Sequence, residues 1–360
     1  MPSRKITEES LIRVIQRTVT SRGRVRLGIG DDAAVLKDGT VVTTDAYAEG
    51  VHFDLSYMSL RQVGERCACG AISDVTAMAA EPEAVFVSLA LPGNAPCLTP
   101  EARRRADAGF KRHASGMKQQ VRQLYSGIED VCAEMGCEVA GGDIIVADQL
   151  LLALTAVGKT RSPRLRSGAR PGDRLYVTGN LGSAEAGRIL LADEVRSQRP
   201  VCRRQKRGKR PAGDWRLPLI RRHLRPVPRL AVMRELRRYF HGLIDTSDGL
   251  ATDARHLSEM SGVRIVLEAE AIPIAPATKR FCVEHGFDPL DFVLEAGEDY
   301  ELLSTSRHRL PSSVKDVKVT AIGSVEDGRG LFIERGGRAV PVTVSGYDHL
   351  RPNSSGKTCY

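Results

Sequence analysis

The sequence predicts a mixed α/β protein, with both α/β and α+β character, divided into two domains. Its 360 residues are enough for two domains of ordinary size. Hydrophobic residues make up 42% and charged residues 27%, which is typical of a globular chain. Strand-like and helix-like segments alternate irregularly, unlike the regular repeat of a barrel. We expect an N-terminal domain over 1–161, a C-terminal domain over 162–350 and a frayed polar tail over 351–360.

The elements of the first domain follow from periodicity and turn residues. Asp38-Gly39 between two apolar runs predicts a hairpin, and Val63, Cys67 and Ala71 are spaced for one face of a helix. Thr99 before Pro100 is typical of a helix start. The expected helices span 8–19, 60–79 and 121–135. One expected strand ends at residue 27, and four more span 33–36, 40–44, 85–91 and 150–157.

The second domain is expected to begin near Ser162, before the turn Arg170-Pro171-Gly172-Asp173. The segment 179–183 predicts an ordinary strand-to-helix turn, because it lacks the residues of a phosphate-binding loop. The expected strands span 174–178, 263–267 and 301–305, the expected helices span 183–192, 228–239 and 247–260, and a closing hairpin turns around Arg335-Gly336-Gly337.

The net charge of +9 is localised in one segment. Residues 196–222 hold eleven lysines and arginines against one acid, Asp214, so the rest of the chain is close to neutral. This basic insertion has no periodic apolar face. It is therefore interpreted as a solvated loop inserted between two elements, and the alternative is an arm that binds RNA or another polyanion. A nucleic-acid partner is not expected.

Sequence features favour a cytoplasmic protein with no membrane partner. The longest apolar run, 150–157, is too short to cross a bilayer, and the N-terminus lacks the apolar core of a signal peptide. The eight cysteines include no Cys-x-x-Cys pair, so neither a zinc site nor a redox pair is indicated. Reduced thiols of a cytosolic protein are the simplest interpretation.

Short acidic islands flanked by Gly, Ser or Thr recur along the chain. No island contains a catalytic lysine, a cysteine pair or a serine triad, and neither a P-loop nor the protein-kinase signatures occur. Carboxylates in tight turns suit magnesium, which reaches proteins through a few carboxylates and substrate phosphates. The pattern predicts a magnesium–nucleotide site built from distant parts of the chain: Gly28-Ile29-Gly30-Asp31-Asp32, Thr43-Thr44-Asp45, Ser73-Asp74, Gly141-Gly142-Asp143 and Asp245-Thr246-Ser247-Asp248-Gly249.

Each island alone also has a structural interpretation. The first matches the dinucleotide fingerprint G-x-G-x-x-A, but a hairpin is expected to follow where that fingerprint needs a helix. Asp74 fits an exposed or capping residue, and Asp143 fits an ordinary turn. Ser247 is placed to cap the next helix. Recurrence of the pattern, rather than any one island, favours the functional interpretation.

Together the islands resemble the thiamine-monophosphate kinases, in the superfamily of aminoimidazole ribonucleotide synthetase and selenophosphate synthetase. The resemblance implies the two-domain aminoimidazole ribonucleotide synthetase-like fold, a homodimer built through the N-terminal β-sheet, and ATP between the domains. It runs from about residue 8 to 350 and includes these segments: 27–32, 43–45, 49–53, 73–74, 77–79, 140–143, 166–173, 222–226, 244–250, 297–302 and 346–349.

The resemblance implies transfer of the γ-phosphoryl group of ATP to thiamine monophosphate, with several Mg²⁺ ions and no acid–base residue. Asp32, Asp74 and Asp143 would carry the chemistry through metal. The implied magnesium ligands are Asp32, Thr43, Thr44, Asp45, Asp74, Asp143, Asp245 and Asp248. The implied ATP contacts are Tyr125, Gly142, Asp143, Arg166 and Ser247. The implied contacts to thiamine monophosphate are His52, Glu298 and Tyr347.

The chain departs from the family pattern at several places. Ile144-Ile145 follows Asp143 where the family usually has Thr-Thr, so two hydroxyls are lost near the phosphates. None of the departures removes an implied metal aspartate. Two alternatives stay open: another ATP-dependent enzyme of the superfamily, acting on a different small phosphate or carbonyl compound, and a degenerate member without catalysis that binds polyanions.

Overall fold

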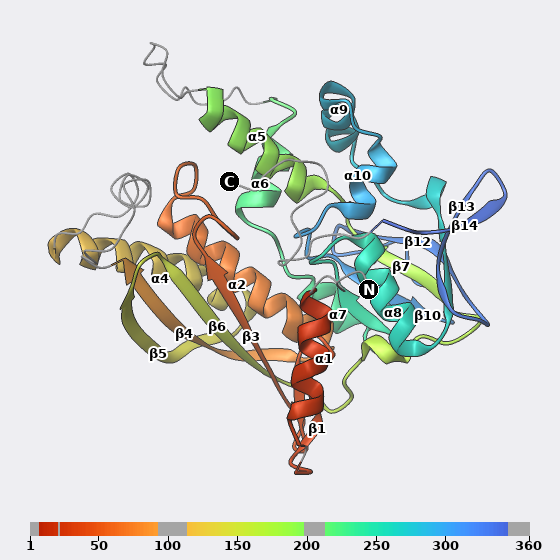
Figure 1. Cartoon of the computed structure of the whole chain (residues 1–360), viewed down its shortest axis with the longest axis horizontal. Coiled ribbons are helices and arrows are strands. Elements are labelled where there is room, and N and C mark those ends of the chain that lie inside the picture. Colours follow the sequence, from red (N-terminus) through yellow and green to blue (C-terminus); the bar gives the residue numbers. More distant parts are fainter. Residues whose placement is uncertain (1–6, 21, 93–113, 198–212, 345–360) are drawn as a thin grey trace, which may run out of the picture.

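The computed structural model describes residues 7–20, 22–92, 114–197 and 213–344. It contains two β-sheets with helices packed on them, which confirms the mixed α/β class (Figure 1). Within the described residues, none of the helices is long and apolar enough to span a lipid bilayer. Tyr347, the tail 351–360, the helix start at Thr99 and most of the basic insertion lie outside the described residues.

The first sheet has the strand order β1-β2-β3-β6-β4-β5. Its helices α2 (Leu60–Ala77) and α4 (Ala114–Met135) pack on each other and on one face of the sheet (Figure 1). Ser59 and Gln62 form a capping box that begins α2, and the helix buries Val63, Cys67 and Ala71 as predicted. The strands are β1 (Val25–Leu27), β2 (Ala34–Leu36), β3 (Thr40–Ala48), β4 (Glu81–Pro92), β5 (Glu138–Ala147) and β6 (Leu151–Lys159).

The second sheet has the order β14-β13-β9-β12-β7-β10-β8, with β11 paired to β12. Its strands are β7 (Arg174–Thr178), β8 (Leu243–Asp245), β9 (Arg264–Glu268), β10 (Leu302–Ser306), β11 (Ser313–Val314), β12 (Val317–Glu326), β13 (Gly330–Arg335) and β14 (Arg338–Pro341). Its helices are η1 (Arg166–Gly168), α5 (Ser183–Ser197), α6 (Leu217–Leu224), α7 (Leu230–Leu236), α8 (Leu250–Ser261), η2 (Ala269–Ala271), α9 (Pro276–His285) and α10 (Pro289–Glu295).

Helix α2 joins the two halves of the molecule. It packs on β3 and β6 of the first sheet and also on α6, α7 and β8 of the second half. The apolar core around α2 continues into that half through residues such as Val232, Met233 and Phe240. Side chains near the C-terminal end of α2 are therefore placed between the two sheets.

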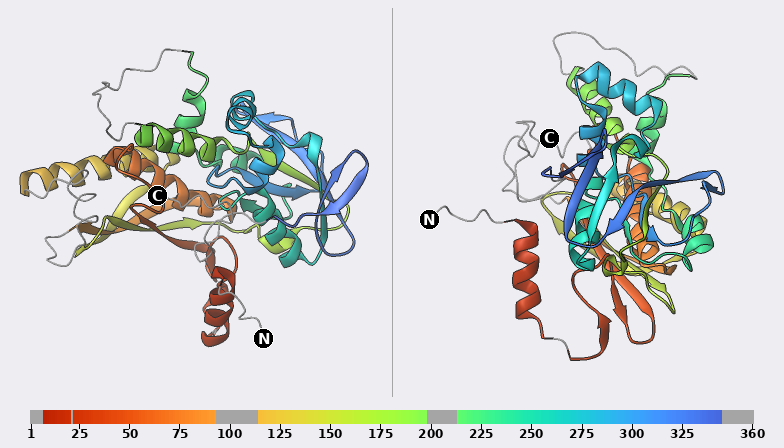
Figure 2. Two further views of the ribbon diagram at one scale, coloured as in Figure 1. Left: turned by 45° about the horizontal axis from the view of Figure 1, so that its top comes forward. Right: turned by 90° about the vertical axis from the view of Figure 1, so that its right-hand side faces the viewer.

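The N-terminal helix α1 (Glu8–Thr18) projects from the rest of the molecule in both views of Figure 2. Thr7 and Ser10 form a capping box at its start. Gln16 Nε2 donates a hydrogen bond of 3.0 Å to the carbonyl oxygen of Ile29, which ties the helix to the first acidic island.

Two structural interpretations of the acidic islands were wrong. The alternative interpretation of Asp143 was an ordinary turn, but the residue lies inside β5, which pairs in parallel with β4. Gly142 makes that pairing possible, because a Cβ there would lie 1.9 Å from the carbonyl oxygen of Val87. Ser247 was expected to cap a helix, but α8 begins later, after Gly249, without a side-chain cap.

The end of the basic insertion is also structured, contrary to the expected solvated loop. Residues 217–224 form α6, which buries Leu219 and Ile220 against its neighbours. Arg222 is inside the molecule and forms an ion pair of 2.5 Å with the buried Glu301. The interpretation failed here because apolar residues occur among the arginines. The sequence patterns also missed α9, α10 and β12.

Candidate functional site

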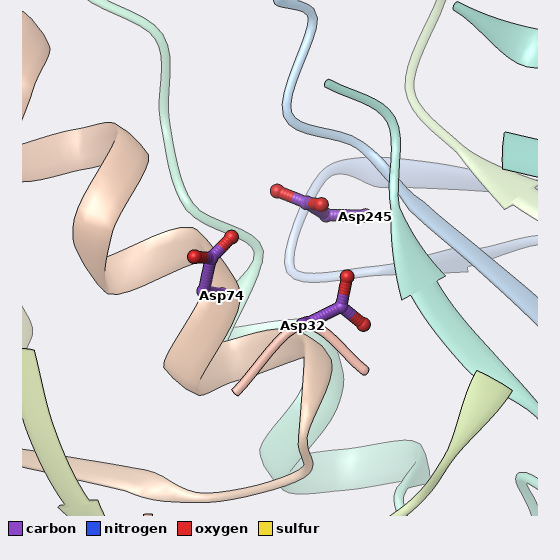
Figure 3. A group of neighbouring side chains, drawn as sticks. All are labelled: Asp32, Asp74 and Asp245. Carbon is purple, nitrogen blue, oxygen red and sulfur yellow. The ribbon is translucent and has the colours of Figure 1, made fainter. Parts of the chain in front are cut away.

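Three aspartates from distant parts of the chain meet between the two sheets. Asp32 follows the first glycine turn, Asp74 lies near the end of α2, and Asp245 ends β8 (Figure 3). One carboxylate oxygen from each lies within 4.8 Å of the other two. The structure therefore brings together three of the acidic islands, as the sequence predicted.

Hydroxyl groups fix two of these carboxylates. Thr43 Oγ1 donates a hydrogen bond of 2.7 Å to Asp74 Oδ2, and Ser73 Oγ donates one of 2.5 Å to Asp245 Oδ2. Each hydroxyl leaves the other carboxylate oxygen of its aspartate for a further partner. Thr43 and Ser73 thus orient the carboxylates of Asp74 and Asp245.

An arginine balances the third carboxylate. Arg166, in η1, donates hydrogen bonds of 3.1 Å and 2.6 Å from Nε and Nη2 to Asp32 Oδ1. Oδ2 of Asp32 is buried and has no hydrogen-bond partner among the described residues. Such a buried oxygen is expected to have a ligand, because unpaired buried polar atoms are costly. Arg166 was expected at ATP, and in this structure its guanidinium group binds the acidic cluster.

Burial and mutual repulsion make the cluster hard to ionise. Burial, followed by repulsion from Asp32, raises the pKa of Asp245 to about 8. Burial also raises the pKa of Asp74 well above its ordinary value, with further contributions from Asp45, Asp245 and Asp32. One arginine does not compensate for this many carboxylates. A divalent cation would, and all-oxygen donors of this kind suit Mg²⁺.

The other expected metal ligands are placed in different ways. Asp45 is on the same side of β3 as Thr43, and burial, countered by a hydrogen bond from Tyr47, raises the pKa of the Asp45 carboxyl. Thr44 points to the opposite face, where its Oγ1 lies 2.9 Å from Thr155 Oγ1, so its side chain is away from the cluster. Asp248 lies three residues beyond Asp245 in the loop before α8.

Three expected ATP contacts share a separate hollow. Tyr125, Gly142 and Asp143 all line an open cavity of about 450 Å³ between α4 and β5. Asp143 is exposed there and is not part of the three-aspartate group. Ser247 does not line this hollow, and its carbonyl oxygen accepts a hydrogen bond of 2.8 Å from the amide of Glu298.

A buried arginine that the sequence analysis missed connects two expected acceptor contacts. Arg66 of α2 is 1% exposed, and its Nε donates a hydrogen bond of 3.2 Å to the carbonyl oxygen of His52. Its Nη2 lies 2.5 Å from Glu298 Oε1. Glu298 has φ +63°, a left-handed conformation that costs free energy in a non-glycine residue. The ion pair holds this strained residue in place.

His52 has a defined tautomer. Its Nδ1 accepts a hydrogen bond of 3.1 Å from the amide of Ala48, so Nδ1 carries no proton and Nε2 does. The Tyr47 ring contacts it edge-on, with centroids 5.6 Å apart.

Other acidic groups near the cluster were also missed. Burial, followed by repulsion from Asp32, raises the pKa of Asp31 to about 6. Asp253, in the first turn of α8, is buried, and that burial raises its pKa well above the ordinary value. Glu301 accepts hydrogen bonds from Arg222 and Arg229. The Gly-Asp-Asp segment could have indicated Asp31. Arg66 and Asp253 lie in helices with no local signal.

Comparisons with known proteins find relatives over most of the chain. Residues 30–160 match the family model for AIR synthase related protein, N-terminal domain. The chain is 32% identical to thiamine-monophosphate kinase of Aquifex aeolicus, over 93% of this chain and 96% of that protein. It is 34% identical to the Methanopyrus kandleri thiamine-monophosphate kinase, over 92% and 94%. A solved structure described as AaThiL complexed with AMPPCP and TMP matches with a TM-score of 0.77 at 32% identity, covering 95% of this chain and 97% of that one. These matches confirm the expected aminoimidazole ribonucleotide synthetase-like fold.

Proposed function

Because the chain belongs to the thiamine-monophosphate kinase family, we propose that it transfers the γ-phosphoryl group of ATP to thiamine monophosphate, giving thiamine diphosphate and ADP. The observation that carries the proposal is the convergence of Asp32, Asp74 and Asp245, all inside motifs of this family. A related structure in complex with AMPPCP, an ATP analogue, and TMP supports both substrates.

The acceptor oxygen belongs to a phosphate and is already ionised near neutral pH. No side chain is therefore needed to remove a proton, and the protein contributes alignment and charge neutralisation. Bound Mg²⁺ would neutralise the phosphate charge that develops in transfer. Asp32, Asp74 and Asp245 are the residues placed to hold it, with Asp45 and Asp248 nearby. Thr43 and Ser73 keep the carboxylates oriented.

The acceptor would lie between His52 and Glu298. The carboxylate of Glu298 can offset the positive charge of a thiazolium ring, and Arg66 holds it in place. Arg66 and Asp74 are eight residues apart in α2, which is about 12 Å along a helix axis. One rigid element thus separates the acceptor ring site from the acidic cluster. Tyr347 remains a proposed acceptor contact and Tyr125 a proposed ATP contact.

The free edge of the first sheet supports the proposed homodimer. β5 is the last strand of that sheet, and its side chains Ile144, Ile145 and Val146 are 57%, 56% and 73% exposed. Phe86 on the neighbouring β4 is 41% exposed. An apolar strand edge of this kind is prone to pair with another chain. A second copy presenting the same strand would cover it by two-fold symmetry.

We also place the domain boundary between residues 161 and 162. The first sheet ends with β6 at Lys159, and the second begins with β7 at Arg174, which supports the division. A cytoplasmic location is proposed because ATP is available there.

A coupled ADP-release assay tests the function. ADP release in Mg²⁺ should depend on thiamine monophosphate and stop in EDTA. In Asp74→Asn, the fold should persist while turnover falls by about two orders of magnitude or more, because a charge that holds metal is lost. Turnover close to that of the parent protein would rule out this role for Asp74. ADP release that thiamine monophosphate does not stimulate, but another small phosphate or carbonyl compound does, would redirect the proposal within the superfamily.

A further inference from the structure

A buried imidazole lies beside the proposed acceptor site. His223, in α6, is 1% exposed, and its carbonyl oxygen accepts a hydrogen bond from Arg66 Nη1. Both ring nitrogens are buried and have no hydrogen-bond partner among the described residues. Most buried polar side-chain atoms in proteins have a partner. The two unpaired nitrogens are therefore expected to have a further partner, which we take to be a bound molecule.

The surroundings of His223 place it in the acceptor region. Its ring lies 5.9 Å from that of Tyr57, and the two rings are tilted relative to each other. The guanidinium group of Arg66 contacts both the His223 backbone and the carboxylate of Glu298. Tyr57 is half-buried and lies close enough to Glu298 to feel its charge. His223, Tyr57 and Glu298 thus surround one guanidinium group.

The charge state of His223 indicates what it can bind. Burial, then repulsion from Arg66 and Arg188, lowers the pKa of His223 well below its ordinary value. The ring is therefore neutral and offers one N–H donor and one acceptor nitrogen. Charged donors bind a phosphate more strongly than a neutral imidazole does. The acceptor nitrogen can take a hydrogen bond from the amino group of a nitrogen heterocycle.

We propose that His223 is a specificity-determining residue of the acceptor site, hydrogen-bonding the aminopyrimidine ring of the acceptor while Tyr57 contacts the face of that ring. The inference rests on the proposed function, because thiamine monophosphate supplies this heterocycle at the end opposite its phosphate. The phosphate would then lie toward the aspartates and the aminopyrimidine toward α6. The exocyclic amino group of the ring would donate one hydrogen bond to the unprotonated imidazole nitrogen.

His223→Phe tests the proposal, because phenylalanine keeps a buried ring and removes both nitrogens. The kcat/KM for thiamine monophosphate should fall about tenfold, the typical value of one hydrogen bond, while the KM for ATP stays unchanged. The Tm should stay the same or rise, since the removed nitrogens have no partner in the described protein. His223→Gln, which again offers a donor and an acceptor, should recover part of the loss.

A second acceptor separates recognition from a structural role. In the 4′-oxo analogue, oxythiamine monophosphate, the amino donor of the pyrimidine is replaced by an acceptor. The parent protein should prefer thiamine monophosphate by about tenfold or more, and His223→Phe should lose that preference. His285→Phe in α9, whose ring stacks on Phe281, is the matched control and should keep it.

Equal losses for both acceptors in His223→Phe, or a lowered Tm with the preference intact, would show that the imidazole only supports the core and would overturn the proposal. An unchanged kcat/KM for thiamine monophosphate would do the same. Failure of the proposed function has a different signature: the parent protein itself would release no ADP in response to thiamine monophosphate.

Discussion

The substitution Asp245→Asn should stabilise the metal-free protein while it impairs the enzyme. The pKa of Asp245 is raised from an ordinary 3.8 to about 8 by burial and by Asp32. Between these two values the folded chain keeps a proton that the unfolded chain has released. The free energy of unfolding of the parent protein therefore decreases as pH rises from about 4 to about 8 and then levels off.

The size of the effect follows from the pKa gap. Each pKa unit is worth about 1.4 kcal/mol, so at pH 7 the roughly three units above 3.8 correspond to about 4 kcal/mol. Asparagine does not titrate and keeps an oxygen that can accept the Ser73 hydroxyl. The variant should therefore gain up to about 4 kcal/mol at pH 7 in EDTA, and almost nothing at pH 4.

Urea unfolding in EDTA at pH 4, 6 and 7 measures this gain in the free energy of unfolding. The further stabilisation by added Mg²⁺ is a second measurement. At a Mg²⁺ concentration 100 times its Kd, the parent protein should gain about 2.7 kcal/mol, and the variant should gain much less. Asp327→Asn, an exposed turn residue between β12 and β13, is the control and should change neither value. A variant less stable than the parent at pH 7 in EDTA, or a gain equal at pH 4 and pH 7, would refute the reasoning.

Two further predictions concern the acceptor site and the proposed dimer. Glu298→Ala should raise the KM for thiamine monophosphate about tenfold and leave the KM for ATP unchanged, because the charge beside the thiazolium is lost. Steady-state kinetics with each substrate varied measures both KM values, and an equal loss for both substrates would argue against Glu298 as an acceptor contact. If the chain forms the proposed homodimer through β5, Val146→Lys should convert it to a monomer without unfolding it, since a charge enters the apolar strand edge. Sedimentation velocity measures this, with Lys318→Ala as control, and a variant that stays dimeric would exclude β5 as the interface.

The parts of the fold that the sequence predicted have local signals. Asp38-Gly39 marked its hairpin because few other residue pairs adopt that turn, and α2 was visible from its apolar period. β5 was missed because Ala140-Gly141-Gly142 has low strand propensity, and only the close approach of β4 explains the glycines. α6 was missed because arginines that pair with buried acids look the same in sequence as solvated ones.

The residues of the candidate site also divide into those with a signal in the sequence and those without one. The convergence of Asp32, Asp74 and Asp245 was predicted from motif recurrence and resemblance, since spacing alone does not bring residues together. Arg66 lies outside the matching segments, and His223 lies inside the segment 222–226, but the resemblance implied no role for either side chain. Their importance comes from burial and from partners about 160 to 230 positions away in the chain, which only tertiary structure reveals.

Because α2 carries both Arg66 and Asp74, a continuous helix sets the separation between the proposed acceptor ring site and the acidic cluster. Inserting a single alanine between these residues would turn one end by about 100° relative to the other, so each site would survive but face the wrong way. Such a protein should still bind ATP and thiamine monophosphate but fail to transfer the phosphoryl group between them.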